Sequence, residues 1–255
     1  MRQTLSVVII TLNEEANIRR TLDSVRWADE IIIVDSGSSD RTAEIARSYG
    51  AKVFIEEWKG FAKQKTLALQ KAGCDWVLSL DADEELEPTL ADEIQRALLA
   101  DPGITGFCVP RKNYFLGRWM RHGGFYPDRK LRLFRRGAGS FEERLVHEDV
   151  HLEGKAATAN LKGHLLHHAY PTLETYIDHM NRYSSLGAQM VEGKTHRTRF
   201  SLLDIVVRPQ LTFFYNYILR LGFLDGREGL LLHLNHCVYV HWKYAKAWQL
   251  ARANK

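Results

Sequence analysis

The stretch Trp76-Val77-Leu78-Ser79-Leu80-Asp81-Ala82-Asp83 joins an apolar run to two carboxylates that stand one residue apart. The run is typical of a buried strand, and carboxylates at its carboxyl end lie at the edge of a sheet where α/β proteins bind ligands. Hard carboxylate oxygens there suit Mg²⁺ or Mn²⁺, which commonly bridge to substrate phosphates. The stretch therefore predicts a site for a metal-bound diphosphate.

An alternative explains Asp81 and Asp83 as part of a solvated loop. Further carboxylates follow them at Glu84, Glu85 and Glu87, and such acidic runs also favour a helix N-terminus. The directness with which Asp81 follows the apolar run argues against this alternative.

Outward from this stretch, the N-terminal half alternates between apolar runs and segments with helical spacing. Strands are predicted at Leu5–Thr11, Glu30–Asp35, Lys52–Glu56 and Asp75–Leu80. Helix starts are predicted at Asn13, at Ser38-Ser39-Asp40 and at Pro88. Alternating strands and helices imply a parallel sheet of an α/β protein.

The pattern changes from Ile104 onward. Strand-like pieces at Gly106–Phe115 and Lys130–Arg135 are expected to complete the sheet and to wall the pocket. Helical spacing returns from Thr172, with an apolar stripe over Leu173, Tyr176, Ile177, Met180, Tyr183, Leu186 and Met190. We therefore expect a catalytic domain at 1–170, with a nucleotide-binding half at 1–105 and an acceptor half at 106–170, and a helical region at 171–255.

The most apolar segment of this region is Phe200–Leu224. Its longest uncharged run, Pro209–Leu219, is shorter than the roughly 20 residues that a spanning helix needs. Two structures fit the segment, a core helix or an amphipathic helix lying in a membrane plane.

Charge is divided unevenly along the chain. Residues 1–105 carry 12 Lys and Arg against 19 Asp and Glu, whereas residues 106–255 carry 23 against 12, a net charge of +11. The basic half fits an anionic partner, for which nucleic acid, phosphorylated glycan and a membrane surface are candidates. The 3 cysteines lie far apart without a CxxC pair, which fits a reducing compartment.

Three motifs together resemble those of family 2 glycosyltransferases of the GT-A fold. They are Ser6 to Glu14 (SVVIITLNE), Ile33 to Thr42 (IVDSGSSDRT) and Leu80 to Glu84 (LDADE), in the order of that family. His147-Glu148 and Gly222 to Gly229 (GFLDGREG) are similar to a subgroup that includes lipopolysaccharide core glucosyltransferases.

The resemblance implies a Rossmann-like nucleotide-diphospho-sugar transferase fold with a helical C-terminal appendage. It implies an inverting, metal-dependent hexosyltransferase that uses Mg²⁺ or Mn²⁺. The implied donor is UDP-glucose, and the implied acceptor is an inner-core heptose of lipopolysaccharide, an anionic glycolipid, reached at the cytoplasmic face of the inner membrane. The basic half and the segment Phe200–Leu224 agree with peripheral attachment to that membrane.

Several residues are candidates for the donor nucleotide. Thr11, Asn13 and Glu14 follow the first strand and offer polar groups to a base and ribose, with a helix cap as the alternative. Asp35 ends the second strand before a turn and is placed either to accept bonds from uracil or ribose or to build that turn. The resemblance favours the nucleotide for Asp35.

The resemblance also distributes roles within the acidic motif. It places Asp81 on the ribose and Asp83 on the metal, which acts as a Lewis acid on the departing diphosphate. Lys65 is the chosen nucleotide-side cation, although Thr66 stands where the family often has Asn. A solvated basic face is the alternative for Lys65.

The cluster from Glu142 to Asp149 supplies candidates for the proton transfer. An inverting transfer needs a carboxylate that accepts the proton of the acceptor hydroxyl, and Glu148 fits best, with Asp149 second. His147 is a candidate to complete the metal shell, since imidazole binds transition ions. A packed histidine with solvated acids is the alternative, against which the resemblance weighs.

Aromatic and cationic residues alternate between the two clusters. Trp119, His122, Tyr126 and Arg132 are the candidate acceptor contacts, because stacking and charge-assisted hydrogen bonds suit a sugar phosphate. A basic surface loop is the alternative. The triplet His164, His167 and His168 is expected to be structural, because its spacing aligns only on a helix.

Two other classes of function compete with a glycosyltransferase. A nucleotidyltransferase also uses acidic metal ligands, but it releases pyrophosphate instead of a nucleoside diphosphate. A nucleic-acid-binding module would use the basic aromatic half, but the acidic N-terminal half disfavours contact with phosphate backbones. We therefore expect no nucleic-acid partner.

Overall fold

A computed structural model describes residues 3–99, 103–141, 150–152, 156–195 and 201–253. The chain divides into two compact units. Unit 1 consists of residues 1–111 and 129–167, and unit 2 consists of residues 112–128 and 168–255. Residues 112–128, which the sequence alone assigns to the catalytic domain, are thus grouped with the C-terminal helices.

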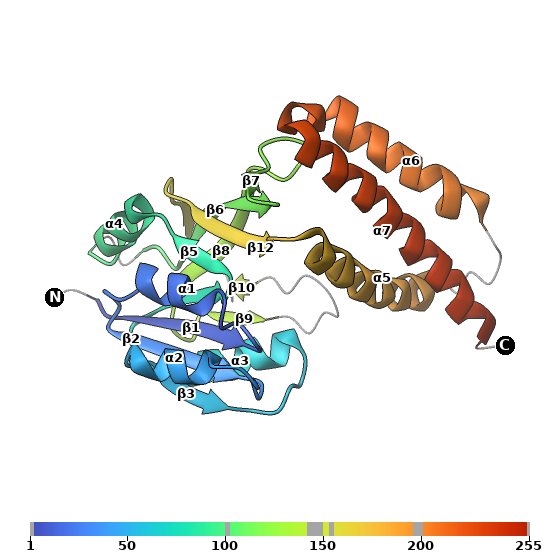
Figure 1. Ribbon diagram of the computed structural model, residues 1–255. Helices are drawn as coiled ribbons and strands as arrows, with labels where there is room; N and C mark the ends of the chain where they lie inside the picture. Colours follow the sequence, from blue (N-terminus) through green and yellow to red (C-terminus); the bar gives the residue numbers. More distant parts are fainter. Residues whose placement is uncertain (1–2, 100–102, 142–149, 153–155, 196–200, 254–255) are drawn as a thin grey trace. The chain divides into compact units, whose positions relative to one another are not determined.

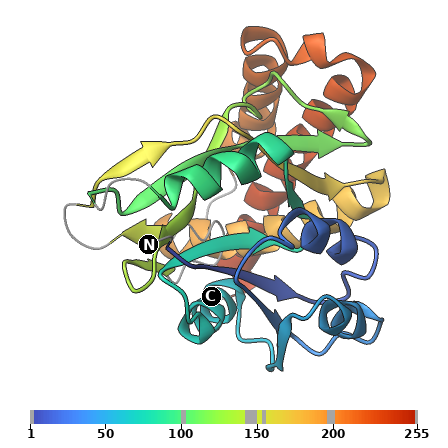
Figure 2. The same cartoon turned by 90° about the vertical axis from the view of Figure 1, so that its left-hand side faces the viewer.

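Four parallel strands of unit 1 form one half of the main sheet. They are β1 (Leu5–Thr11), β2 (Glu30–Asp35), β3 (Lys52–Ile55) and β4 (Trp76–Asp81), side by side in the order β3-β2-β1-β4 (Figures 1 and 2). Their bounds confirm the strands predicted from sequence to within one residue at each end, and their parallel pairing is confirmed as well.

The other half of the sheet is mixed. It continues as β4-β8-β6-β12-β5, with β7 and β11 paired to β6. These strands are β5 (Glu84–Leu86), β6 (Gly106–Phe115), β7 (Arg118–Trp119), β8 (Asp128–Arg135), β11 (Thr158–Asn160) and β12 (Leu165–Tyr170). A separate pair joins β9 (Gly139–Phe141) to β10 (Val150–Leu152). The strand β12 pairs antiparallel with β5, the strand that directly follows Asp83. Residues of β12 therefore lie beside the acidic motif.

Helices supply apolar side chains to both faces of this sheet. They are α1 (Ile18–Ser24), α2 (Thr42–Ser48), α3 (Phe61–Lys71) and α4 (Pro88–Ala97). Val7 of β1 shares a buried cluster with Leu22 of α1 and Leu90 of α4. Its neighbour Val8 belongs to a second cluster with Ala68 of α3. Successive strand residues point to opposite faces, so α3 covers the face opposite α1 and α4.

One predicted helix start is wrong. The helix α1 begins at Ile18, with Asn17 before it, and not at Asn13. Asn13 has φ 55°, in the left-handed region that single Asn residues adopt but helices do not. The other two starts are confirmed, since α2 begins at Thr42, beside Asp40, and α4 begins at Pro88.

Unit 2 is mainly helical. Its elements are α5 (Leu173–Thr195), the π-helical turns η1 (Leu203–Val207) and η2 (Phe214–Leu219), α6 (Arg208–Phe213), the 3₁₀ turn η3 (Gly222–Asp225) and α7 (Gly226–Ala253). The long helix α7 contacts both α5 and α6 (Figure 1). The buried apolar cluster of unit 2 consists of Phe115, Met120, Tyr176 and Leu232. Within the described ranges, no helix combines the length and the apolar character needed to cross a membrane.

Candidate active site

The carboxyl ends of neighbouring strands bring three candidate residues to one edge of the sheet. The register of β1 and β2 pairs Thr11 with Asp35, and the register of β1 and β4 pairs Ile10 with Asp81. Parallel strands end at the same edge, where α/β proteins bind ligands. The structure therefore places Thr11, Asp35 and Asp81 at a common edge.

Asp35 is buried, with 1% of its surface exposed. Its Oδ2 accepts a hydrogen bond from Thr11 Oγ1 at 2.8 Å, and its Oδ1 accepts bonds from the backbone N–H groups of Gly37 and Ser38 at 3.0 and 2.8 Å. Gly37 has φ +87°, which glycine adopts without steric cost. Asp35 therefore builds the turn after β2.

The loop after β1 is tied to the loop after β2. The N–H of Asn13 donates to Ser38 Oγ, and the Oδ1 of Asn13 accepts a bond from the N–H of Ser39, both at 2.8 Å. The N–H of Glu14 donates to Thr42 Oγ1 at 2.8 Å. These bonds explain why Asn13 does not start a helix, because its polar groups are used between the loops.

Glu14 lies in an acidic environment. Burial raises the pKa of Glu14 from 4.5 to about 7; the hydrogen bond from Asn17 opposes this rise, and the charges of Asp83, Asp40 and Asp81 add to it. Burial is the main cause of the raised pKa, but three carboxylates also surround Glu14, so negative charge gathers at this place. Such a place favours a cation.

Asp81 is held between two cations. Lys65 Nζ lies 2.7 Å from Asp81 Oδ1, and Arg132 Nη2 lies 2.6 Å from Asp81 Oδ2. Burial raises the pKa of Asp81, but the charges of Arg132 and Lys65 outweigh it and hold that pKa well below its ordinary value. The Asp81 side chain keeps 28% of its surface exposed, so a hydroxyl group of a ligand has access to an ionised carboxylate.

A second buried carboxylate completes this network. The side chain of Glu84 is 0% exposed, and its Oε1 accepts bonds from Arg132 at 2.6 Å and from Arg111 at 3.0 Å. Its Oε2 accepts a bond from the N–H of Asp81 at 3.1 Å. Buried charges are tolerated when they are paired and hydrogen-bonded, so Glu84 and its two arginines fix the position of Asp81.

Asp83 has a histidine partner. His167 Nε2 lies 3.4 Å from Asp83 Oδ2, because His167 of β12 is directly opposite Glu84 of β5 in the antiparallel register. Burial raises the pKa of Asp83, but the charge and the hydrogen bond of His167 outweigh it and lower that pKa. The sequence alone left His167 as a structural residue.

His167 and His168 lie on β12 and His164 directly precedes it, and the three histidines lie in three environments. His164 Nδ1 lies 3.1 Å from Glu87 Oε2, and the ring of His168 stacks on Tyr114 with centroids 4.9 Å apart. Only His167 of the three is beside the acidic motif. The alternation of side chains along a strand explains why His167 and His168 separate.

The donor atoms of Asp83 and His167 fit Mg²⁺ or Mn²⁺. A carboxylate oxygen suits either ion, and an imidazole nitrogen suits Mn²⁺ better. No group of three or more His, Cys, Asp or Glu residues in the described part of the chain is arranged to hold a metal ion. A cation bound by one or two protein groups together with substrate phosphates needs no such group.

The four predicted acceptor residues are divided between the units. Trp119, His122 and Tyr126 lie in unit 2, where the rings of Trp119 and Tyr126 meet edge to face at 5.2 Å. Arg132 lies in unit 1 and is 6% exposed, bonded to Asp81 and Glu84. Its environment is therefore not the basic surface loop that its neighbours in sequence suggest.

The predicted proton acceptors lie elsewhere in the chain. Glu148 and Asp149, together with the candidate metal ligand His147, lie outside the described residues. Their roles stay predictions. Arg111 of β6 and Glu84 of β5, which are not among the predicted site residues, also belong to the site.

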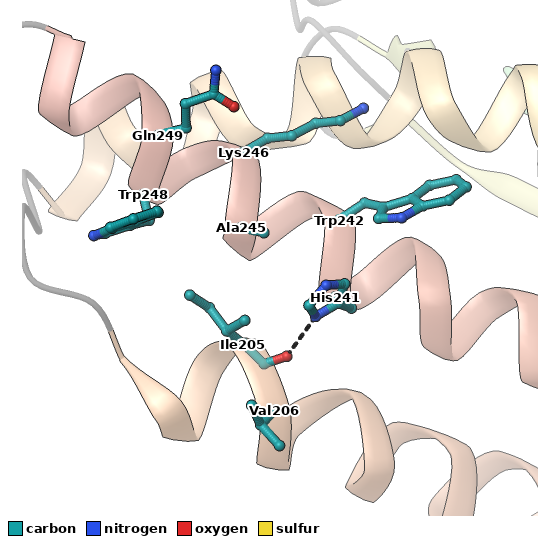
Figure 3. Close-up of a pocket in the computed structure, with 8 residues that line it drawn as sticks. All are labelled: Ile205, Val206, His241, Trp242, Ala245, Lys246, Trp248 and Gln249. Atoms are coloured by element: carbon teal, nitrogen blue, oxygen red, sulfur yellow. Dashed lines mark hydrogen bonds between the residues drawn. The ribbon is translucent and has the colours of Figure 1, made fainter.

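A separate pocket of about 490 Å³ belongs to unit 2 (Figure 3). It is lined by Ile205, Val206, His241, Trp242, Ala245, Lys246, Trp248 and Gln249. His241 Nδ1 lies 2.9 Å from the carbonyl oxygen of Ile205, which joins α7 to η1. The mostly apolar lining contains no carboxylate, so this pocket does not provide the acidic chemistry of the sheet edge.

Known proteins resemble this chain over most of its length. Residues 6–152 match the model of glycosyl transferase family 2. A lipopolysaccharide core biosynthesis glycosyltransferase from Rhizobium meliloti is 34% identical over 251 residues, which cover 96% of this chain and 92% of that protein. An uncharacterized glycosyltransferase from Rickettsia typhi is 32% identical over 241 residues, which cover 89% and 80%.

The chain therefore belongs to glycosyltransferase family 2. Its mixed α/β sheet followed by helices is the GT-A type of fold that the sequence predicts, with the helical C-terminal part present. Glucosyl-3-phosphoglycerate synthase from Mycobacterium tuberculosis, crystallised with Mn²⁺, UDP and glucosyl-3-phosphoglycerate, is 29% identical over 44% of each chain, with a TM-score of 0.36. That likeness spans less than half of the synthase.

Proposed function

We propose that this glycosyltransferase moves a hexose from a nucleotide-diphosphate sugar, with UDP-glucose as donor, to an inner-core heptose of lipopolysaccharide or a related glycolipid. The observation that carries the proposal is the sheet edge at which Asp81 lies between Lys65 and Arg132. The Rhizobium relative, which is 34% identical over 96% of this chain, supports the class of acceptor. Another cell-surface polysaccharide or a protein acceptor is the alternative.

The donor nucleotide would bind along the edge formed by the loops after β1, β2 and β4. Asp81, ionised and fixed by its two cations, accepts a hydrogen bond from a ribose hydroxyl. Asn13 and Glu14 face the base and ribose from the loop after β1, and Thr11 and Asp35 hold the two loops in register. Lys65 adds a positive charge on the nucleotide side.

A divalent cation, Mg²⁺ or Mn²⁺, would be held by Asp83, with the predicted ligand His147 as a nitrogen donor and His167 beside Asp83. When bound, it supplies a Lewis acid that offsets negative charge on the departing nucleoside diphosphate. Asp83 contributes an ionised oxygen, because its pKa is lowered despite burial. His167 orients that oxygen.

Inversion at the sugar requires a carboxylate on the face opposite the leaving group. We assign the proton of the acceptor hydroxyl to Glu148, with Asp149 as the second candidate. Both are predictions from the sequence and the family. The proton passes to a carboxylate oxygen as the new glycosidic bond forms.

A glycolipid acceptor places the reaction at a membrane surface. We propose a peripheral protein at the cytoplasmic face of the inner membrane, with Trp119 and Tyr126 on the acceptor side. Large apolar side chains of unit 2 support this placement, because Leu203 is 71% exposed and Leu211 is 61% exposed. Exposed apolar patches of this kind mark surfaces for lipid or protein contact.

A transfer assay with the full chain tests the proposal. Purified protein, UDP-glucose and Mn²⁺ are incubated with lipopolysaccharide truncated at the heptose region, and released UDP and product mass are measured. We expect stoichiometric UDP and one added hexose, both lost with EDTA and in Asp83→Asn. Release of pyrophosphate would instead indicate a nucleotidyltransferase, and transfer that survives EDTA would contradict the metal role of Asp83.

A further inference from the structure

Two turns of unit 2 meet around a histidine and a buried carboxylate. The N–H of His122 donates to Asp225 Oδ2 at 2.8 Å, and His122 Nδ1 lies 2.8 Å from Asp225 Oδ1. The side chain of Asp225 is 3% exposed, whereas that of His122 is 33% exposed. Since Asp225 engages Nδ1, the nitrogen that remains for a ligand is Nε2.

Glycines lock these turns together. A Cβ atom on Gly123 or on Gly222 would lie 2.1 or 2.3 Å from Nε2 of His233, a side chain that is 2% exposed. No larger residue fits at either position without displacing this buried ring. The orientation of His122, next to Gly123 in sequence, is therefore set by a tight contact between the turns.

The guanidinium group of Arg220 lies against the turn that contains Gly123 and Gly124. A Cβ atom on Gly124 would lie 2.2 Å from Arg220 Nη1, and the N–H of Gly123 donates to the carbonyl oxygen of Arg220 at 2.9 Å. Arg220 is exposed. Within the described residues, its Cζ lies 5.7 Å from the centroid of the Tyr215 ring, and no carboxylate forms an ion pair with it. An exposed cation thus lies against the turn that carries His122.

Large apolar side chains surround Arg220 in the sequence and are exposed. The exposed fractions are 61% for Leu219, 46% for Leu221, 43% for Phe223 and 50% for Leu224. Leu221 has φ 59°, in a region that a leucine rarely adopts, so the backbone holds it there against its own preference. A cation among exposed apolar side chains is typical of an interface between water and lipid.

We propose that Arg220 and His122 bind the phosphate of an anionic phospholipid, while Leu219, Leu221, Phe223 and Leu224 enter the apolar layer of the same membrane. The planar guanidinium matches a phosphate in geometry, and an imidazole Nε2 that carries a proton can donate to a phosphate oxygen. A nucleic acid would leave the four apolar side chains without a partner. This site rests on the membrane contact proposed above and names the lipid group that is recognised.

Vesicle flotation of the full chain tests the site. The probes are vesicles of phosphatidylcholine alone and of phosphatidylcholine mixed with phosphatidylglycerol. Arg220→Ala should weaken binding to the anionic vesicles about fivefold and leave binding to the neutral vesicles unchanged. Arg220→Lys should restore part of the loss, since the charge remains but the planar fork does not. Asp225→Asn and His122→Gln should each reproduce the loss on anionic vesicles.

Matched controls in unit 1 separate the site from general effects. Arg96→Ala removes another cation, from α4, and should leave both vesicle types bound as before. Phe223→Ser should weaken binding to both vesicle types, whereas Leu99→Ser, at a residue that is 68% exposed, should not. Thermal melting by circular dichroism checks that every variant is folded.

Two results would overturn the site. The first is undiminished binding of Arg220→Ala to anionic vesicles, and the second is an equal loss in Arg96→Ala, which would indicate unspecific attraction. If the unaltered chain floats with neither vesicle, both the lipid site and the proposed membrane contact fail. UDP release on a water-soluble acceptor would still support the transferase function, so the failures are distinguishable.

Discussion

The sheet edge of unit 1 and the helices of unit 2 place charge and apolar surface in opposite ways. At the edge, the side chain of Glu84 is 0% exposed and the side chain of Arg132 is 7% exposed. In unit 2, Leu203 is 71% exposed and Leu219 is 61% exposed. Buried charge needs partners, and exposed apolar surface needs a cover. The contrast is explained if unit 1 binds a charged nucleotide and unit 2 contacts a lipid surface.

The largest effect on catalysis is expected from loss of the proton acceptor Glu148, which lies within the predicted catalytic domain 1–170. Glu148→Gln should lower kcat about 10³-fold, because the acceptor hydroxyl loses its base, and should leave the Kd for UDP nearly unchanged. Steady-state kinetics and titration calorimetry measure the two quantities. Asp149→Asn serves as the matched variant, with a smaller loss expected, and near-normal turnover in Glu148→Gln would refute its role.

Removing Arg132 would disrupt the buried ion network that it forms with Asp81 and Glu84. Arg132→Met leaves Asp81 and Glu84 without their shared cation, so the free energy of unfolding should fall by about 3–5 kcal/mol. Urea unfolding followed by circular dichroism measures this change. Arg129→Met, at an exposed residue of the same strand, should change it by less than about 0.5 kcal/mol. Equal effects of the two substitutions would show that the network is not buried as described.

A third prediction concerns pH. The pKa of Glu14 is about 7 in the folded chain against an ordinary value of 4.5, so the folded state holds this proton more tightly. The stability that Glu14 contributes is complete below pH 4.5 and is lost as the pH rises to about 7, a change of up to about 3 kcal/mol.

Urea unfolding at several pH values across this window tests the assignment. The unaltered chain should lose stability as the pH rises from 4.5 to about 7. The Glu14→Gln variant should lose less, because the amide does not ionise. Identical profiles for the two proteins would place the titration elsewhere.

The smallest effect on catalysis is expected from replacing exposed apolar residues of unit 2. Replacing both Leu203 and Leu211 by Ser should lower binding to phospholipid vesicles about tenfold, because two exposed apolar side chains no longer enter the lipid. The kcat on a water-soluble acceptor should not change. Vesicle flotation and a transfer assay, run on the same preparation, compare the two, and unchanged flotation would remove these residues from the membrane contact.

The strands of the parallel half could be predicted because buried parallel strands appear in the sequence as short apolar runs. Leu5–Thr11 and Glu30–Asp35 have the predicted bounds. The placement of Asp81 at the carboxyl end of β4 follows from the same pattern. These features depend on neighbouring residues, which a sequence displays directly.

The partners of the acidic motif could not be predicted in this way. Arg132 reaches Asp81 only because β8 lies antiparallel to β4, and His167 reaches Asp83 only because β12 lies beside β5. Such pairings join residues far apart in the chain. One signal for the burial of Arg132 was present in the sequence. Arg132 lies two residues before the apolar Phe134 on β8, so the two side chains share one face of the strand, and Phe134 is buried.

The error at Asn13 has a similar origin. An Asn before two Glu residues is a common helix start, but here the polar atoms of Asn13 bond to Ser38 and Ser39 in the loop after β2. The grouping of residues 112–128 with the C-terminal helices was also hidden. It depends on contacts such as that of His122 with Asp225, 103 positions later.

Calorimetric titration of UDP and UDP-glucose into the full chain, with Mn²⁺ and then with EDTA, tests whether the sheet edge is a metal-dependent donor site. We expect micromolar binding, about −8 kcal/mol, that requires the metal and is weakened in Asp83→Asn. Binding of equal strength in EDTA, or no binding of either nucleotide, would contradict a metal-dependent donor site at the edge of the sheet.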